Sequence, residues 1–120
     1  MRVECIQTRS STTGERVKKS PWLTVGKTYT VLAISASPGR EILLRLIGDD
    51  GDTAGLFSSD MFETIDTRLP PTWIAKLDTD GTLELAPAEW MREGFWEDYF
   101  NGDPSAISAF EGARRIIEAA

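Results

Sequence analysis

The sequence predicts an α+β domain in which a β-rich first two thirds is followed by a helical C-terminal third. Short apolar and β-branched runs, separated by turn sequences, fill residues 1–66. Two further runs flank an Asp-Gly turn within residues 73–85, which is the pattern of a hairpin. From Pro87 onward the apolar residues recur at helical spacing.

The expected strands of residues 1–66 are separated by two turn sequences. Residues 37–40 read Ser-Pro-Gly-Arg, and residues 48–52 read Gly-Asp-Asp-Gly-Asp. Proline fixes φ, while glycine and aspartate tolerate the conformations of tight turns, so two successive hairpins are expected. The expected strands are 1–8, 28–36, 41–47, 53–57 and 62–65.

Two other segments are expected to interrupt this sheet. Residues 9–21 are polar and carry four basic side chains against one acidic side chain, so we expect a long mobile loop. A basic binding loop is the alternative. Pro70 and Pro71 cannot continue a strand ladder, so the chain is expected to leave the first sheet there.

The C-terminal segment is expected to form two helices. Pro87 and Pro104 suit the first position of a helix, where the missing amide costs nothing, and Asp103 suits the N-cap of the second helix. That helix is expected over 104–118. Its apolar stripe should comprise Ile107, Phe110, Ala113 and Ile117.

Residues 22–66 resemble a known small fold. Leu-Thr-Val-Gly-Lys at 23–27 looks like a turn that feeds a second strand, and residues 53–62 look like a glycine, a strand, a short helical turn and a closing strand. This order resembles a Src-homology-3-like (SH3-like) barrel, with Gly55 and Phe62 at structural positions. The resemblance implies an SH3-like small β-barrel, followed by the hairpin and the two C-terminal helices.

The peptide-binding groove of that family is not expected here. Family members line the groove with a tryptophan near the start of the third strand, with tyrosines, and with a proline before the helical turn. Here the middle strand has Leu43 and Leu44 without tryptophan, Ser58 stands where the proline would be, and Met61 replaces a tyrosine. Recognition of polyproline peptides by an aromatic groove is therefore not predicted.

At 120 residues the chain is expected to be a single domain. Its expected parts are the barrel over 1–66, a linker and hairpin over 67–86, and an acidic helical segment over 87–120 that packs on the barrel. No stretch approaches eighteen apolar residues, and Glu4 interrupts any secretory leader. A cytoplasmic protein without a membrane partner is expected.

Charge is distributed unevenly along the chain. Residues 1–77 carry 10 basic and 9 acidic side chains, whereas residues 78–120 carry 3 and 10, which gives +1 and −7 and the total of −6. This asymmetry predicts an acidic face in the C-terminal third. Binding to nucleic acid needs a basic footprint, so nucleic acid is not expected as a partner. An acidic face is expected to bind a basic protein, which the resemblance described below would make a toxin.

The sequence predicts no catalytic activity and no cofactor. The chain has no histidine and a single cysteine, which removes the commonest general base and any tetrahedral zinc site within one chain. Cys5 alternates with Val3 as an inward-facing strand position would, so we expect a buried thiol and not a nucleophile.

Two aspartate-rich segments are weighed as metal sites. Residues 78–89 have the first, third and twelfth positions of a calcium loop, but Gly81 is fourth instead of sixth and Leu83 takes the sixth place. Asp49, Asp50 and Asp52 could hold magnesium, although the same residues suit a turn. Turns are predicted for both segments, and no metal.

Residues 90–100 hold five of the eleven aromatic residues of the chain. Five aromatic side chains on so short a segment cannot all face one core. Trp90 and Phe95 are expected to anchor the helical end against the barrel, whereas Trp96 and Tyr99 are expected to stay accessible. Accessible tryptophan and tyrosine beside carboxylates make a plausible interface anchor.

The same segment carries several carboxylates. In one continuous helix, Met91, Phe95 and Tyr99 would share a stripe, and the glutamates at 89, 93 and 97 would form another. Repulsion within that second stripe costs about 0.2–0.5 kcal/mol per pair, which a cationic partner would offset. The predicted partner-binding residues are Glu89, Glu93, Trp96, Glu97, Asp98 and Tyr99.

The whole layout, a small protein with an acidic helical end and without a catalytic set, resembles small bacterial immunity proteins. That resemblance implies an inhibitor that neutralises a toxin by direct binding, the toxin being basic or nucleic-acid-processing. The alternative hypothesis is a non-catalytic adaptor or regulatory module of a larger complex. A third is a metal-dependent enzyme that uses the aspartates.

Overall fold

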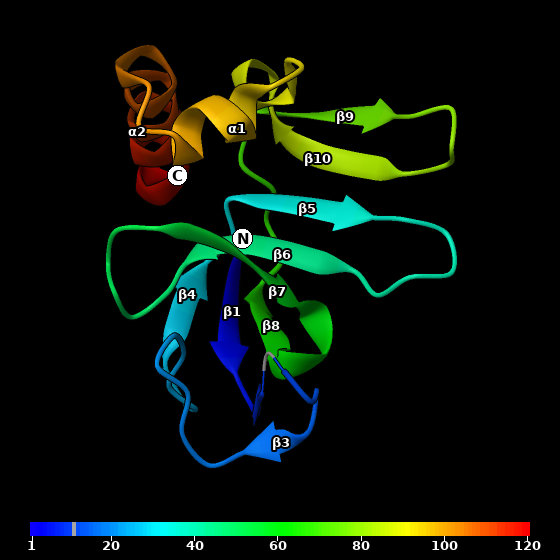
Figure 1. Ribbon diagram of the computed structural model, residues 1–120, viewed down its shortest axis with the longest axis vertical. Coiled ribbons are helices and arrows are strands. Elements are labelled where there is room, and N and C mark those ends of the chain that lie inside the picture. The colour runs from blue at the N-terminus through cyan, green and yellow to red at the C-terminus, as the bar shows by residue number, and fades with distance from the viewer. Residues whose placement is uncertain (11) are drawn as a thin grey trace.

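Figure 1 shows the computed structural model, which describes residues 1–10 and 12–120. The described chain combines antiparallel strands in three sheets with two C-terminal α-helices, which confirms the α+β class. The strands are β1 (Arg2–Cys5), β2 (Thr8–Arg9), β3 (Arg16–Val17), β4 (Thr28–Thr30), β5 (Ala33–Ala36), β6 (Leu43–Ile47), β7 (Ala54–Ser58), β8 (Phe62–Asp66), β9 (Trp73–Leu77) and β10 (Leu83–Pro87). The helices are α1 (Phe95–Phe100) and α2 (Pro104–Ala119), with 3₁₀ turns at Ser59–Met61 and Ala88–Met91.

The two larger sheets have the orders β4-β1-β8 and β7-β6-β5-β10-β9. The chain crosses from one to the other inside the predicted strand 28–36. The Val31 amide donates to the carbonyl of Met1, whereas the Leu32 amide donates to the carbonyl of Arg45. Both side chains are fully buried, each in a different core, so the strand divides here. Neither sheet closes on itself within the described residues, so the predicted closed barrel is not shown.

The hairpin predicted after the two prolines is confirmed as β9 and β10. The chain does leave the sheet of β8, but β10 pairs with β5 and so extends the other large sheet. At the turn, Gly81 has φ of +89°, a conformation that side-chain-bearing residues rarely adopt, and the Asp80 carboxylate accepts a bond of 2.9 Å from the Thr82 amide. This segment of the calcium-loop pattern is therefore a hairpin turn.

The loop predicted over residues 9–21 is partly ordered into a small ladder. Thr8 pairs with Val17 and Arg9 with Arg16, and the Thr8 hydroxyl donates to the Val17 carbonyl at 2.8 Å. The expectation of a long loop is therefore wrong at Arg9 and at β3, because cross-strand bonds stabilise residues that lack apolar anchors. Ser11, which belongs to the same predicted loop, lies outside the described residues.

Buried side chains form two cores. One core lies between the two large sheets and is built within residues 3–62. It contains Cys5, fully buried as predicted, and burial raises the pKa of this thiol. The second core joins the outer face of the five-stranded sheet to the helical segment. Its buried members are Leu32, Ala33, Ala54, Ala86, Trp90, Phe95, Ala106, Phe110, Ala113 and Ile117.

The predicted first helix is broken. The 3₁₀ turn Ala88–Met91 ends before Gly94, whose φ of +79° separates it from the six-residue α1. Met91, Phe95 and Tyr99 therefore do not share one helical stripe. The reason is that a left-handed glycine cannot lie within a continuous α-helix.

Helix α2 agrees with its prediction to within one residue, and the Asp103 carboxylate caps it by accepting from the Ala106 amide at 2.9 Å. The predicted buried stripe is wrong at one position. Ala106 is buried, whereas Ile107 is 37% exposed. The buried residues Ala106, Phe110, Ala113 and Ile117 share one face because their spacings of four, three and four positions alternate about the helical repeat, whereas Ile107 lies beside that face.

Candidate interaction surface

The aromatic residues of 90–100 pack around one side chain of α2. Phe110 is fully buried, with its ring centroid 5.0 Å from that of Trp90 and 4.7 Å from that of Tyr99. Trp90 and Phe95 are buried, as predicted. The cluster fastens the helical segment to the outer face of the five-stranded sheet, where Figure 1 shows α1 between α2 and β10.

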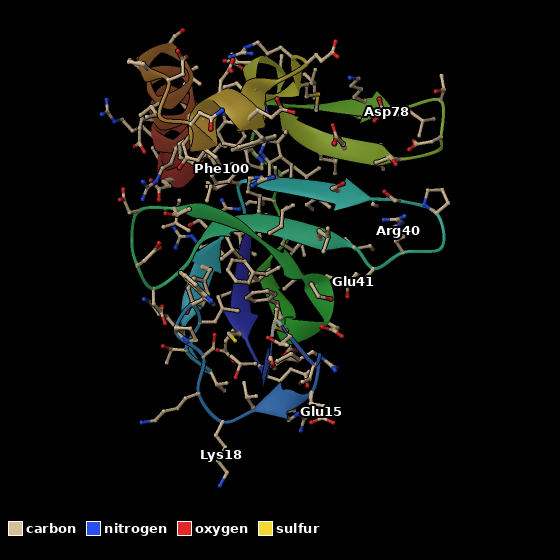
Figure 2. All side chains as sticks on the ribbon, viewed as in Figure 1. Glu15, Lys18, Arg40, Glu41, Asp78 and Phe100 are labelled. Atoms are coloured by element: carbon tan, nitrogen blue, oxygen red, sulfur yellow. The ribbon has the colours of Figure 1, made fainter. Side chains whose placement is uncertain are left out.

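The two aromatic residues predicted to be accessible are partly buried. Trp96 and Tyr99 both pack against the core of the helical segment. The most exposed aromatic side chain of the segment is Phe100, at 55%, and the sequence analysis did not select it. Phe100 is the last residue of α1, five positions after the buried Phe95 and therefore on another side of the helix. Figure 2 shows it beside α1 on the helical end of the molecule.

Trp96 also covers a buried charge that the sequence analysis did not select. The Arg45 guanidinium lies 3.7 Å from the centroid of the Trp96 ring, and its Nη1 donates to the Ala54 carbonyl at 3.2 Å. Arg45 is only 8% exposed, and burial lowers its pKa to about 10. The sequence feature that could have indicated a buried arginine is its position in the middle of the apolar run Leu-Leu-Arg-Leu-Ile.

The predicted carboxylates differ in how far they are neutralised. Glu89, Glu93 and Glu97 are exposed, and none has a cation within 4.0 Å in the described part of the chain. Asp98, in contrast, pairs with Arg92 at 3.0 Å. We call Glu89, Glu93, Glu97 and Phe100 the acidic surface.

The basic segment 9–21 does not adjoin the acidic surface. In Figure 2, Glu15 and Lys18 lie at the end of the molecule opposite α1 and Phe100, along its longest axis. That axis measures 37 Å, several Debye lengths at physiological salt. The two charged regions therefore act as separate surfaces.

A surface hollow lies along β7. It has a volume of about 790 Å³ and is walled by residues 17–23 on one side and by β6 and β7 on the other. Trp22 and Leu56 line it and are 49% and 46% exposed. Its rim carries both basic and acidic side chains, so its charge does not favour a partner of either sign. The rim charges are Arg9, Lys19, Glu41 and Asp50.

Asp49 does not behave as a simple turn residue. Its carboxylate accepts hydrogen bonds from the Thr24 hydroxyl at 2.7 Å and from the Lys27 ammonium and the Tyr29 hydroxyl at 2.8 Å each. The Lys27 bond is the main reason that the pKa of Asp49 is lowered. Asp49 thus ties the turn at 48–52 to the segment before β4, a long-range role that the sequence analysis missed.

The described residues, 1–10 and 12–120, contain no group of three or more histidine, cysteine, aspartate or glutamate side chains placed to hold a metal ion. Within the same residues, no helix is long and apolar enough to cross a membrane. Comparisons with protein-family models, with curated proteins and with solved structures gave no match to this chain.

Proposed function

We propose that this chain is a cytoplasmic protein-binding inhibitor of the immunity-protein kind, which neutralises a basic, toxin-like protein by direct binding. The observation that carries the proposal is the acidic surface, in which three exposed glutamates lack a cation within 4.0 Å in the part of the chain that the structure describes. Such a surface raises the rate at which a basic protein is encountered.

The scaffold in this proposal is an SH3-like barrel to which a hairpin and a helical end have been added. Its support is the order of elements, with β2 and β3 between β1 and β4, and with the 3₁₀ turn Ser59–Met61 between β7 and β8. The hairpin extends the five-stranded sheet beside β5, and the helical end covers the outer face of that sheet and carries the acidic surface. The binding residues then lie away from the peptide groove of the SH3 family.

The proposal predicts that charge reversal on the acidic surface slows binding. A pull-down from the native host identifies the partner, and the purified pair is then studied by surface plasmon resonance. Replacing Glu89, Glu93 and Glu97 together by lysine should lower the association rate about tenfold or more at low ionic strength, because it reverses the steering field. Most of this difference should vanish in high salt.

A matched variant distinguishes the effect of the local electrostatic field on the association rate from the effect of the total charge. Glu15, Glu41 and Glu63 are also exposed and lie outside the acidic surface, and their replacement by lysine changes the total charge equally. The matched variant should retain more of the association rate. Equal losses in both variants, or no loss in the first, would contradict the proposal.

Phe100 is the predicted apolar anchor of the complex. Because its side chain is already 55% exposed, Phe100→Ala should leave the fold intact. It should raise the dissociation rate and, as for a binding hot spot, weaken the binding free energy by about 2 kcal/mol. Trp96, which the sequence favoured, is a poorer probe since it also covers Arg45. An unchanged dissociation rate, with unchanged circular dichroism, would place the interface elsewhere.

One observation favours the adaptor hypothesis as a second candidate. The hollow along β7 has an apolar lining and is separate from the acidic surface. A chain that binds one partner at each place would bridge them. In an adaptor, Trp22→Ala should then abolish binding of one partner and leave binding of the other unchanged. In a dedicated inhibitor that binds through the acidic surface, the same substitution should not weaken binding of the single partner.

A further inference from the structure

A small cavity lies between the five-stranded sheet and the helical segment. Its volume is about 110 Å³, and its walls come from β5, β6, β10 and residues 90–96. Its three polar lining residues stand on the sheet: Ser35 on β5, Arg45 on β6 and Glu84 on β10. The remaining lining, which includes Leu56 of β7, is apolar or aromatic: Ala33, Ile34, Leu56, Ala86, Trp90, Met91 and Trp96.

Arg45 has hydrogen-bonding capacity that the protein does not use. A guanidinium has five N–H donors, and Arg45 finds one acceptor within the described residues, the Ala54 carbonyl. None of the ion pairs formed by these residues includes Arg45. The stacked ring of Trp96 contacts the face of the guanidinium, so the edge, which carries the donors, remains free.

Within the described residues the mostly buried charge of Arg45 has no ion pair, which has a free-energy cost, although solvent still reaches its unpaired donors. Arg45 is more than nine-tenths buried, and a buried charge normally has an oppositely charged partner. Arginine cannot escape the cost by losing its proton at neutral pH. An acceptor that enters the cavity would therefore gain more than it would from an arginine in water.

The chemistry of the cavity limits what can enter. The fork of a guanidinium matches the two oxygens of a carboxylate. Sites for drug-sized ligands measure about 300–1,000 Å³, so a cavity of about 110 Å³ admits only a small group, such as a carboxylate on a short stem. The surrounding aromatic and aliphatic groups suit an apolar stem.

The carboxylate of Glu84 repels a bound carboxylate and so lowers the affinity of the cavity for it. Its carboxylate lines the same cavity, but Glu84 is partly exposed and stands opposite Lys76 in the ladder of β9 and β10. Arg45 is more deeply buried, so its charge is screened less by solvent. Glu84 therefore offsets part of the field of Arg45, and an anion should bind more weakly than it would without Glu84.

We propose that this cavity is a carboxylate-binding site in which Arg45 grips the carboxylate and Trp96 forms the lid. The carboxylate belongs either to a free short-chain organic acid or to an aspartate or glutamate side chain of a protein partner. The proposal rests on the cavity alone and stands whether or not the acidic surface binds a toxin.

The first test is a titration of the full chain with sodium acetate at constant ionic strength. Nuclear magnetic resonance signals of the Arg45 Nε–H and the Trp96 indole N–H should shift and saturate. Methylammonium chloride should leave both in place. Shifts that do not saturate, or that methylammonium reproduces, would overturn the proposal.

A second arm distinguishes the two sources. A capped Gly-Glu-Gly peptide and its Gly-Gln-Gly counterpart are titrated in the same way. Tighter binding of the glutamate peptide than of acetate assigns the site to a protein side chain, and tighter binding of acetate assigns it to a free acid. Failure of both carboxylates refutes the site.

Variants of the lining residues then test whether the acetate-induced shifts arise from binding in the cavity. Arg45→Lys keeps the charge but loses the fork, so acetate affinity should fall about tenfold or more. Glu84→Gln should raise it, and Arg115→Gln on the exposed face of α2 should not change it. Unchanged affinity in both Arg45→Lys and Glu84→Gln would overturn the proposal. Within the described part of the chain neither Arg45 nor Glu84 forms an ion pair, so both variants should fold.

Discussion

Replacing Phe110 by alanine is expected to lower the free energy of unfolding by about 3–5 kcal/mol, the usual cost of truncating a buried phenylalanine. Phe110 is fully buried and contacts the rings of Trp90, Trp96 and Tyr99. It is the side chain of α2 around which the helical segment packs. Its loss leaves a cavity between α2 and the sheet that the rigid rings cannot fill.

Denaturant titration measures this loss, with Phe100→Ala as the matched control. Both variants remove one phenylalanine ring from the same segment, but Phe100 is 55% exposed and should cost about 1 kcal/mol or less. Near-ultraviolet circular dichroism should report loosened aromatic packing in the Phe110 variant alone. Similar losses in the two variants would mean that the aromatic cluster does not anchor the helical end.

Asp49→Ala is expected to cost about 2–3 kcal/mol at neutral pH, because it removes the acceptor for three hydrogen bonds, one of them from an ammonium group. Tyr29 is the most affected donor, since it is 5% exposed and belongs to the core between the sheets. Without Asp49 its hydroxyl keeps only its bond to the Thr24 amide. The turn at 48–52 should also loosen.

The effect of Asp49 should depend on pH in a defined direction. Its pKa is lowered from 3.8, chiefly by the bond from Lys27, so the folded state favours the charged carboxylate. The stabilisation is fully present above the pKa of the unfolded chain, near 3.8, and is lost as the pH falls through the lower pKa of the folded state. The difference in stability between wild type and Asp49→Ala should therefore be constant from about pH 6 to 8 and shrink below about pH 4.

Asp50→Asn serves as the control for this prediction. Asp50 is exposed, and its carboxylate accepts only long bonds of 3.4 and 3.5 Å within its own turn. Urea titrations at several pH values should give this variant nearly the stability of the wild type throughout. A difference between wild type and Asp49→Ala that stays constant down to pH 2 would show that Asp49 does not depend on its charge.

The candidate surface could be predicted only in part. The exposed glutamates at 89 and 93 follow from charge counting, because glutamate rarely lies inside a protein without a partner. The exposed aromatic residue could not be predicted, because five aromatic side chains compete for one core. Contacts with Phe110 bury Tyr99, whereas Phe100 remains outside.

Local chemistry was sufficient for several elements of the fold. Gly81 in the hairpin turn, Asp103 at the N-cap of α2 and Cys5 in the core all follow from residues within a few positions of one another. Each depends on backbone conformation or on strand alternation, which neighbouring residues determine. The sequence alone therefore determined the α+β class, most strands and the last helix.

Long-range contacts determined the rest. The division of the strand at Val31 and Leu32 depends on bonds to Met1 and to Arg45, and the position of β10 depends on its pairing with β5. No short window of sequence contains both members of such a pair. The burial of Arg45 has the same cause: its strand pattern is local, but Trp96, which covers it, lies 51 positions along the chain. Only tertiary packing could bring that ring over the charge, because hydrophobic burial acts between surfaces and not along the chain.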